Sequence, residues 1–104
     1  MAVIGLYIYP EKQKQLSSQV QLIRKAVVAE KHQLLEVDES SAEKIDWLIA
    51  LGGDGTLLRA AVIARERACP LLGISAGHLG FLAEIMIDQL PDALDRMAQA
   101  NYHL

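Results

Sequence analysis

Four short segments of the chain are rich in apolar side chains and have the length of β-strands. The first is apolar without interruption until Pro10, as expected for a strand buried on both faces of a sheet. The third leads directly into a glycine-rich turn. The predicted strands cover residues 2–9, 33–38, 46–51 and 71–74, and the polar stretch 39–45 is predicted to be a loop.

Three longer segments carry apolar residues at the spacing of one helical face. Helices are predicted over residues 15–31 and 56–68, and a last helix is predicted to follow Asp88 as its cap. In that helix Asp92 can pair with Arg96, one turn later. The expected buried positions are Leu16, Val20, Ile23 and Val27 in the first helix, Leu57, Ala61, Ala64 and Ala68 in the second, and Leu90, Leu94 and Met97 in the third.

The order of these elements alternates strands with helices, which indicates an α/β fold with a mainly parallel sheet flanked by helices. In such sheets ligands bind outside the carboxyl ends of the strands. Two glycine-rich loops follow the third and the fourth predicted strands. We therefore expect a binding site at that edge of the sheet.

The first loop reads Gly52-Gly53-Asp54-Gly55-Thr56. Glycine permits positive φ and a close approach of ligand to backbone, and the amides that open the next helix can donate to phosphate. A carboxylate repels phosphate, so Asp54 predicts a chemical role as a base or metal ligand. The competing interpretation is a tight turn in which Asp54 caps the helix. The loop matches neither the Walker A pattern nor Gly-x-Gly-x-x-Gly, which disfavours hydride transfer.

The second loop reads Ser75-Ala76-Gly77-His78-Leu79-Gly80-Phe81. Phe81 is the only phenylalanine of the chain and can stack on a base, although a core position is the commoner place for such a ring. For His78 we favour a local hydrogen bond over a catalytic role.

Length and composition fit one small globular domain. The chain has 104 residues, of which 52% are hydrophobic and 22% charged, and its net charge of −3 gives no reason to expect binding to nucleic acid or membranes. The single cysteine, Cys69, excludes an intramolecular disulfide and fits a reducing compartment. The N-terminus has no basic region before an apolar core, and no apolar run approaches a membrane span. We expect a cytoplasmic protein, with residues 1–104 as a single α/β nucleotide-binding domain in the N-terminal part of a longer chain.

The two glycine loops together carry a resemblance. Gly52-Gly53-Asp54-Gly55-Thr56 followed by Gly73-Ile74-x-x-Gly77-x-Leu79-Gly80-Phe81-Leu82 resembles the ATP-dependent NAD kinase family over essentially the whole chain. The first motif is shared with diacylglycerol and sphingosine kinases and, more loosely, with phosphofructokinases. The second motif discriminates, because the lipid kinases have a Pro-x-Gly-Thr-x-Asn-Asp loop that is absent here.

The resemblance implies a Rossmann-like, phosphofructokinase-like domain and a reaction. ATP would donate its γ-phosphate to the 2′-hydroxyl of the adenosine ribose of NAD, which gives NADP. Asp54 matches the general base of that family and Gly55 its backbone neighbour in the NAD site. The implied nucleotide-binding residues are Gly52, Gly53, Asp54, Gly55, Thr56, Leu58, Arg59, Phe81 and Leu82.

Individual positions carry different expectations. Leu58 and Phe81 match positions that pack around the adenine of NAD, with Leu82 beside them, and Arg59 matches a position that faces phosphate. Ser75 stands where the family frequently has Asn, and the shorter hydroxyl cannot donate and accept from two separate atoms as an amide does.

The resemblance also implies partners that the chain does not contain. The family carries a second, β-rich domain with an Asn-Glu or Asn-Asp pair, which is absent here, and full-length members usually form homodimers or homotetramers. A divalent cation, Mg²⁺, would bridge the phosphates. Two alternatives to an NAD kinase stay open: an isolated, non-catalytic nucleotide-binding module and the catalytic half of a lipid kinase.

Overall fold

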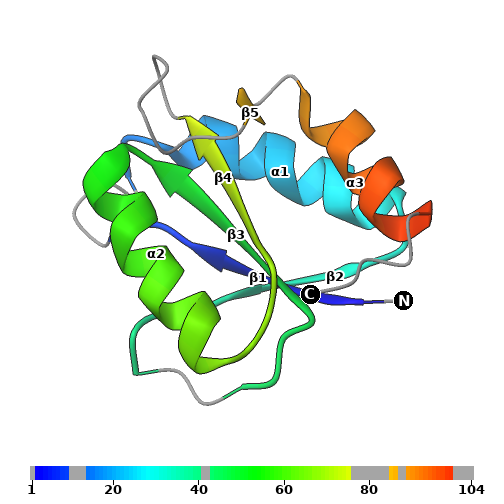
Figure 1. Cartoon of the computed structure of the whole chain (residues 1–104). Coiled ribbons are helices and arrows are strands. Elements are labelled where there is room, and N and C mark those ends of the chain that lie inside the picture. The colour runs from blue at the N-terminus through cyan, green and yellow to red at the C-terminus, as the bar shows by residue number, and fades with distance from the viewer. Residues whose placement is uncertain (1, 10–13, 41–42, 76–84, 87–88, 100–104) are drawn as a thin grey trace.

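A computed structural model describes residues 2–9, 14–40, 43–75, 85–86 and 89–99. In this part of the chain a five-stranded sheet is flanked by helices on both faces (Figure 1), which confirms the predicted α/β class. The elements in chain order are β1 (Val3–Tyr7), α1 (Ser17–Ala29), β2 (Gln33–Glu36), β3 (Trp47–Gly52), α2 (Asp54–Glu66), β4 (Leu71–Ser75), β5 (Ile85–Met86) and α3 (Leu90–Gln99).

All neighbouring strands of the sheet are parallel, in the order β2-β1-β3-β4-β5. From β1 the chain passes through α1 to β2, which lies toward one end of the sheet. From β3 it passes through α2 to β4, which lies toward the other end. The order of the strands therefore reverses between β1 and β3. Open α/β sheets bind their ligands outside the carboxyl ends of the strands at such a reversal.

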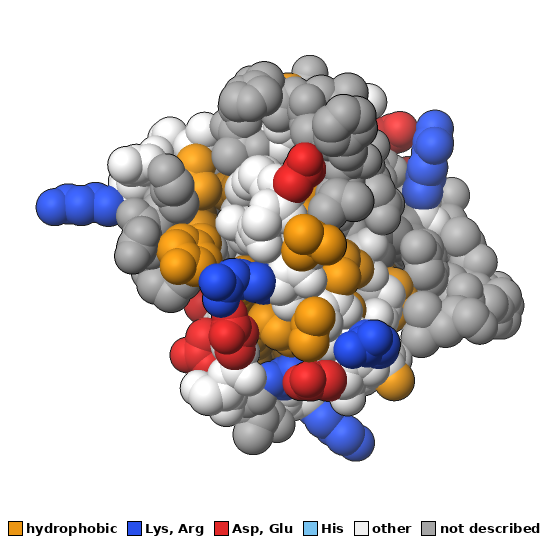
Figure 2. Space-filling model, turned by 60° about the vertical axis from the view of Figure 1, so that its left-hand side comes forward, with side chains coloured by type: hydrophobic (Ala, Val, Ile, Leu, Met, Phe, Trp, Pro, Cys, Tyr) orange, Lys and Arg blue, Asp and Glu red, His pale blue; other side chains and the backbone are white. Residues whose placement is uncertain are grey.

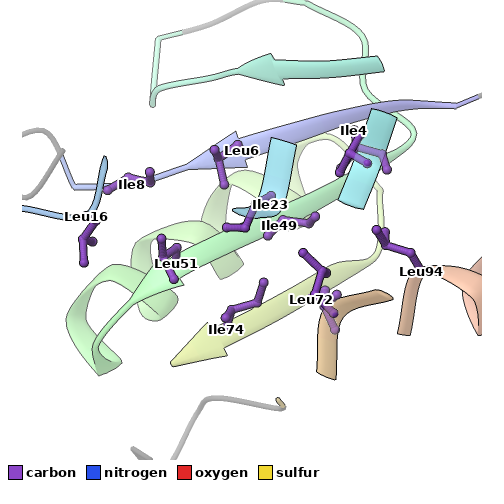
Figure 3. Packing of buried hydrophobic residues seen from close by; sticks show 12 residues of the cluster. Ile4, Leu6, Ile8, Leu16, Ile23, Ile49, Leu51, Leu72, Ile74 and Leu94 are labelled. Atoms are coloured by element: carbon purple, nitrogen blue, oxygen red, sulfur yellow. The ribbon is translucent and has the colours of Figure 1, made fainter. Parts of the chain in front are cut away.

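One hydrophobic core lies between the sheet and the helices α1 and α3 (Figure 3). Alternate residues of a strand point to opposite faces, so Ile4 and Leu6 of β1 enter this core together with Ile49 and Leu51 of β3. The predicted buried positions of α1 are confirmed, with Val20 only partly buried, as are Leu90 and Leu94 of α3. The remaining buried members of this core are Ile8, Leu16, Ile23, Val27, Leu72 and Ile74.

A second core lies between the opposite face of the sheet and α2, and here one prediction is wrong. Helix α2 buries Leu57, Ala60, Ile63 and Ala64, whereas Ala61 and Ala68 are exposed. The helix turns its larger isoleucine rather than Ala61 toward the sheet, because more apolar area is removed from water that way. Ala68 lies beyond the end of the helix, with φ of 51°.

The boundaries of the elements differ from the predicted ones by up to a few residues. Strand β1 ends at Tyr7, although the following Ile8 is still buried. Strand β5 was not predicted, because two residues are too few to leave a periodic pattern. The predicted ion pair between Asp92 and Arg96 is confirmed at 3.5 Å.

Two further expectations, the cap by Asp88 and the burial of the Met97 side chain, lie outside the described residues. Within the described parts of the chain, no helix combines the length and the apolar character that a membrane span requires.

Candidate functional site

The turn between β3 and α2 is closed tightly at Gly52. This residue has φ of +155°, and a Cβ atom placed on it would lie 2.8 Å from both Cβ and Oγ1 of Thr56. A side chain at position 52 would therefore collide with the first turn of α2. Glycine is required here by the protein's own packing.

The next two glycines face open space. Gly53 is the N-cap of α2 without a side-chain cap hydrogen bond, and a Cβ atom added to Gly53 or Gly55 would meet no atom of the described part of the chain within 4 Å. The first helical bond of this turn runs from the Leu57 N–H to the Gly53 carbonyl at 3.0 Å. The amides before Leu57 thus stand at the positive end of the helix dipole, where anions bind favourably.

Asp54 is the first residue of α2 and is half-buried. The helix begins two residues earlier than predicted, so Asp54 lies in its first turn and not in the preceding loop. The alternative in which Asp54 is the N-cap is wrong, because Gly53 holds that position. The helix dipole stabilises a carboxylate in the first turn. The negative charge of Asp54 is therefore favourable at the start of α2, next to the uncrowded backbone of Gly53 and Gly55.

The second glycine loop begins next to the first. Ser75, the last residue of β4, is paired in the sheet register with Gly52 and is buried. Both loops therefore start at one edge of the sheet, as expected for loops that follow two parallel strands. His78, Phe81 and Leu82 lie outside the described residues.

Leu58 and Arg59, two of the predicted binding residues on α2, lie on its exposed surface. The side chain of Leu58 is 58% exposed, and Val62, one turn later, is also exposed. Beside them a cavity of about 230 Å³ is lined by Arg59, Glu39, Val62, Ile63 and Glu66. Figure 2 brings forward the side of the molecule that lies to the left in Figure 1 and shows hydrophobic side chains between basic and acidic ones.

Arg59 belongs to a polar cluster that the sequence interpretation missed. The Tyr7 hydroxyl donates to Oε1 of Glu39 at 3.0 Å, and Nη1 of Arg59 donates to the same oxygen at 3.2 Å. The Arg59 guanidinium also lies over the ring of Tyr9, with Cζ 5.1 Å from the ring centroid. The positions of these residues along the chain could have indicated the cluster. Tyr7 and Tyr9 lie at the end of one strand and Glu39 follows the next strand, at the edge of the sheet where open α/β folds bind their ligands.

The cluster changes the ionisation of its members. Burial, the hydrogen bond to Glu39 and the negative charge of Glu39 raise the pKa of Tyr7 to about 12. The hydrogen bond and the charge of Glu39 also raise the pKa of Arg59 above its usual value. Tyr7 therefore stays a neutral donor, and Arg59 a cation, throughout the physiological range.

Among the described residues, no group of three or more His, Cys, Asp or Glu side chains is arranged to hold a metal ion. Mg²⁺ in phosphoryl-transfer sites is commonly held by one or two carboxylates together with substrate phosphates. A single carboxylate, Asp54, at the open start of α2 fits that kind of site.

Comparison with known proteins shows the family. Residues 3–102 match the family model described as "ATP-NAD kinase N-terminal domain". The chain belongs to this family. The match covers both glycine loops and all described strands and helices.

Curated relatives of the chain bear the same family name. The chain is 41% identical over 92 residues to an NAD kinase of Thermobifida fusca, a match that covers 86% of this chain and 28% of the relative. An NAD kinase of Moorella thermoacetica is 47% identical over 68 residues, with 65% and 22% covered. An NAD kinase of Flavobacterium johnsoniae is 37% identical over 81 residues, with 78% and 28% covered. The chain spans about a quarter of the length of these relatives.

Proposed function

We propose that this chain is the nucleotide-binding N-terminal part of an NAD kinase. The reaction transfers the γ-phosphate of ATP to the 2′-hydroxyl of the adenosine ribose of NAD. The observation that carries the proposal is the position of Asp54 at the open start of α2, outside the carboxyl ends of the strands, in a chain of the NAD kinase family.

Asp54 acts as the general base in this proposal. Its carboxylate takes the proton of the ribose hydroxyl as that oxygen attacks the γ-phosphorus and the bond to the β-phosphate oxygen breaks. The amides of the first turn of α2 donate to phosphate oxygens, and the open space at Gly53 and Gly55 lets those oxygens approach the backbone. Mg²⁺, which the substrate phosphates and the Asp54 carboxylate would hold, would spread the charge that develops on those phosphates.

The other predicted residues bind rather than react. Leu58, whose side chain is already exposed, forms an apolar wall for the adenine together with Phe81 and Leu82, and Arg59 faces a phosphate. Gly53 and Thr56 belong to the turn that faces the triphosphate, and the lack of a side chain at Gly52 leaves room for Thr56. Assembly into homodimers or homotetramers and a cytoplasmic location belong to the same proposal.

The direct test is Asp54→Asn in the whole encoded protein, assayed for NADP formation. Loss of a general base lowers kcat by about 10²- to 10⁴-fold, and the isosteric amide keeps the fold. Asp92→Asn, which removes an exposed carboxylate of α3, serves as the matched control and is expected to keep wild-type turnover. Near-normal turnover of Asp54→Asn would remove Asp54 from the mechanism.

A second function is favoured by one observation, the share of about a quarter that the chain covers of its relatives. Residues 1–104 alone then form a non-catalytic nucleotide-binding module. We expect no NADP formation by the purified 104-residue chain, and turnover by it would contradict this expectation. Phosphorylation of diacylglycerol without activity on NAD would instead support the lipid kinase alternative.

A further inference from the structure

Glu39 connects three elements through one oxygen atom. Its Oε1 accepts the hydroxyl proton of Tyr7 at 3.0 Å and a guanidinium proton of Arg59 at 3.2 Å. Tyr7 ends β1, Glu39 follows β2 and Arg59 lies in the second turn of α2. The carboxylate thus links the helix that begins at Asp54 to the two strands on the other side of the strand-order reversal.

Two features fix the position of this oxygen. Tyr7 is 1% exposed and packs in the core beneath α2, so its hydroxyl is a rigid anchor. The backbone around Glu39 is held by Asp38, whose Oδ1 accepts from the backbone N–H and the hydroxyl of Ser40, each at 2.8 Å. Glu39 is therefore held at both its backbone and its side chain.

The ion pair with Arg59 contributes little to stability. The side chains of Arg59 and Glu39 are 52% and 56% exposed, and exposed pairs are worth about 0–1 kcal/mol. The ion pair matters more for the orientation of Arg59 than for stability. The guanidinium is held by Glu39 and also lies over the Tyr9 ring. A guanidinium has five N–H donors in a planar fork, and a fork held on one side can present its other donors to a phosphate.

We propose that Glu39 is a positioning residue that orients Arg59 toward a phosphate group of a bound nucleotide. The proposal rests on the proposed function, which places nucleotides at this edge of the sheet. Both ATP and NAD carry phosphate groups, so the shared chemistry is a nucleotide phosphate. Separate titrations with the two nucleotides identify which of them Arg59 contacts.

The test uses Glu39→Ala and Glu39→Gln in the whole encoded protein. Glu39→Ala removes the carboxylate that holds Arg59. We expect the KM of one nucleotide to rise by about three- to fivefold, which corresponds to the energy of an exposed ion pair, with kcat little changed. Glu39→Gln keeps an oxygen acceptor for Tyr7 and Arg59, and we expect it to restore most of the affinity. Glu36→Gln, which removes the carboxylate of a similar exposed pair with Arg24, is the matched control and should leave KM unchanged.

A double-mutant cycle with Arg59→Ala shows whether Glu39 acts through Arg59. In the Arg59→Ala background, Glu39→Ala should have no further effect on KM. An equal rise in both backgrounds would overturn the proposal, and so would an unchanged KM in Glu39→Ala. Tighter binding in both Glu39 variants would overturn it as well, because Glu39 would then compete with phosphate for Arg59.

The outcome for wild-type protein separates this proposal from the proposed function. Turnover of NAD by the wild type, together with an unchanged KM in Glu39→Ala, overturns the positioning role alone. Calorimetric binding of ATP that depends on Glu39, without turnover of NAD, overturns the NAD kinase function and supports the positioning role. Failure of the wild type to bind either nucleotide overturns both.

Discussion

The two ends of α2 differ in how their terminal backbone groups are capped. At its C-terminal end the backbone closes on itself, with the Ala68 N–H bonded to the Arg65 carbonyl at 3.2 Å and the Cys69 N–H bonded to the Ala64 carbonyl at 3.0 Å. These are the two bonds of a Schellman motif, which satisfy the last carbonyls of a helix. At the N-terminal end the N-cap is Gly53, which makes no side-chain cap hydrogen bond.

Two of the three glycines at the N-terminal end of α2, Gly53 and Gly55, are not required by the packing of the described residues. The left-handed position after α2 is Ala68 with φ of 51°, and the corresponding position after α1 is Lys31 with φ of 63°. Glycine would relieve both, since only it adopts this conformation without steric cost. Gly53 and Gly55 instead stand where a Cβ would meet no atom of the described residues within 4 Å. The comparison teaches that the packing of the described residues explains Gly52 but not Gly53 and Gly55, and room for a bound nucleotide is the role we propose for these two glycines.

The largest expected effect comes from Gly52→Ala, which tests the one glycine of this turn that packing requires. The added Cβ would lie 2.8 Å from Thr56 in a backbone conformation that side chains avoid. We expect the free energy of unfolding, measured by urea denaturation, to fall by about 2 kcal/mol or more. Gly53→Ala, which adds the same methyl group to open space, is the control. An equal loss in both variants would contradict the distinction between the two positions.

A smaller effect is expected at high pH, from the cluster that ties the first half of α2 to β1. Folding raises the pKa of Tyr7 from about 10 to about 12. The stabilisation is fully present below pH 10 and is lost as pH rises from 10 to 12, because the unfolded tyrosine ionises first. We expect a loss of about 1 kcal/mol in excess of that seen for Tyr7→Phe, reduced from the full linkage value because Glu39 is half-exposed. Parallel pH curves for both proteins would contradict the shift.

Gly55→Ala separates stability from binding at the open end. Alanine is the better residue inside a helix, and its Cβ would meet no atom of the described residues within 4 Å, so we expect unfolding to require about 0.5–1 kcal/mol more. Nucleotide affinity, measured by calorimetry on the whole encoded protein, should fall in the same variant. A stable variant with unchanged affinity would show that Gly55 does not make room for a ligand.

Ala68→Gly makes the reverse exchange at the closed end and has the smallest expected effect. Removal of the Cβ from a residue at φ of 51° should stabilise the protein by about 0.5 kcal/mol, and nucleotide affinity should not change. Lys31→Gly after α1 is the parallel case. Destabilisation of both variants would show that the side chains at these positions contribute more than the strain costs.

The strands and the place of the glycine loops followed from the sequence because their signals are local. Apolar runs separated by amphipathic segments define a parallel α/β sheet, and a loop that follows such a strand must lie at its carboxyl end. The buried face of α2 was less well determined. Small residues are weak markers of burial, and the preference for Ile63 over Ala61 depended on the sheet against which the helix packs.

The sequence by itself thus determined the α/β class, the glycine turn with Asp54 and the resemblance that the family match bears out. Only the tertiary structure decided that Glu39 meets Tyr7 and Arg59, which are 32 and 20 positions away along the chain. That meeting depends on the strand order, which places β1 beside both β2 and β3. No periodicity of single residues encodes such an order, because it arises from the packing of the whole sheet against its helices.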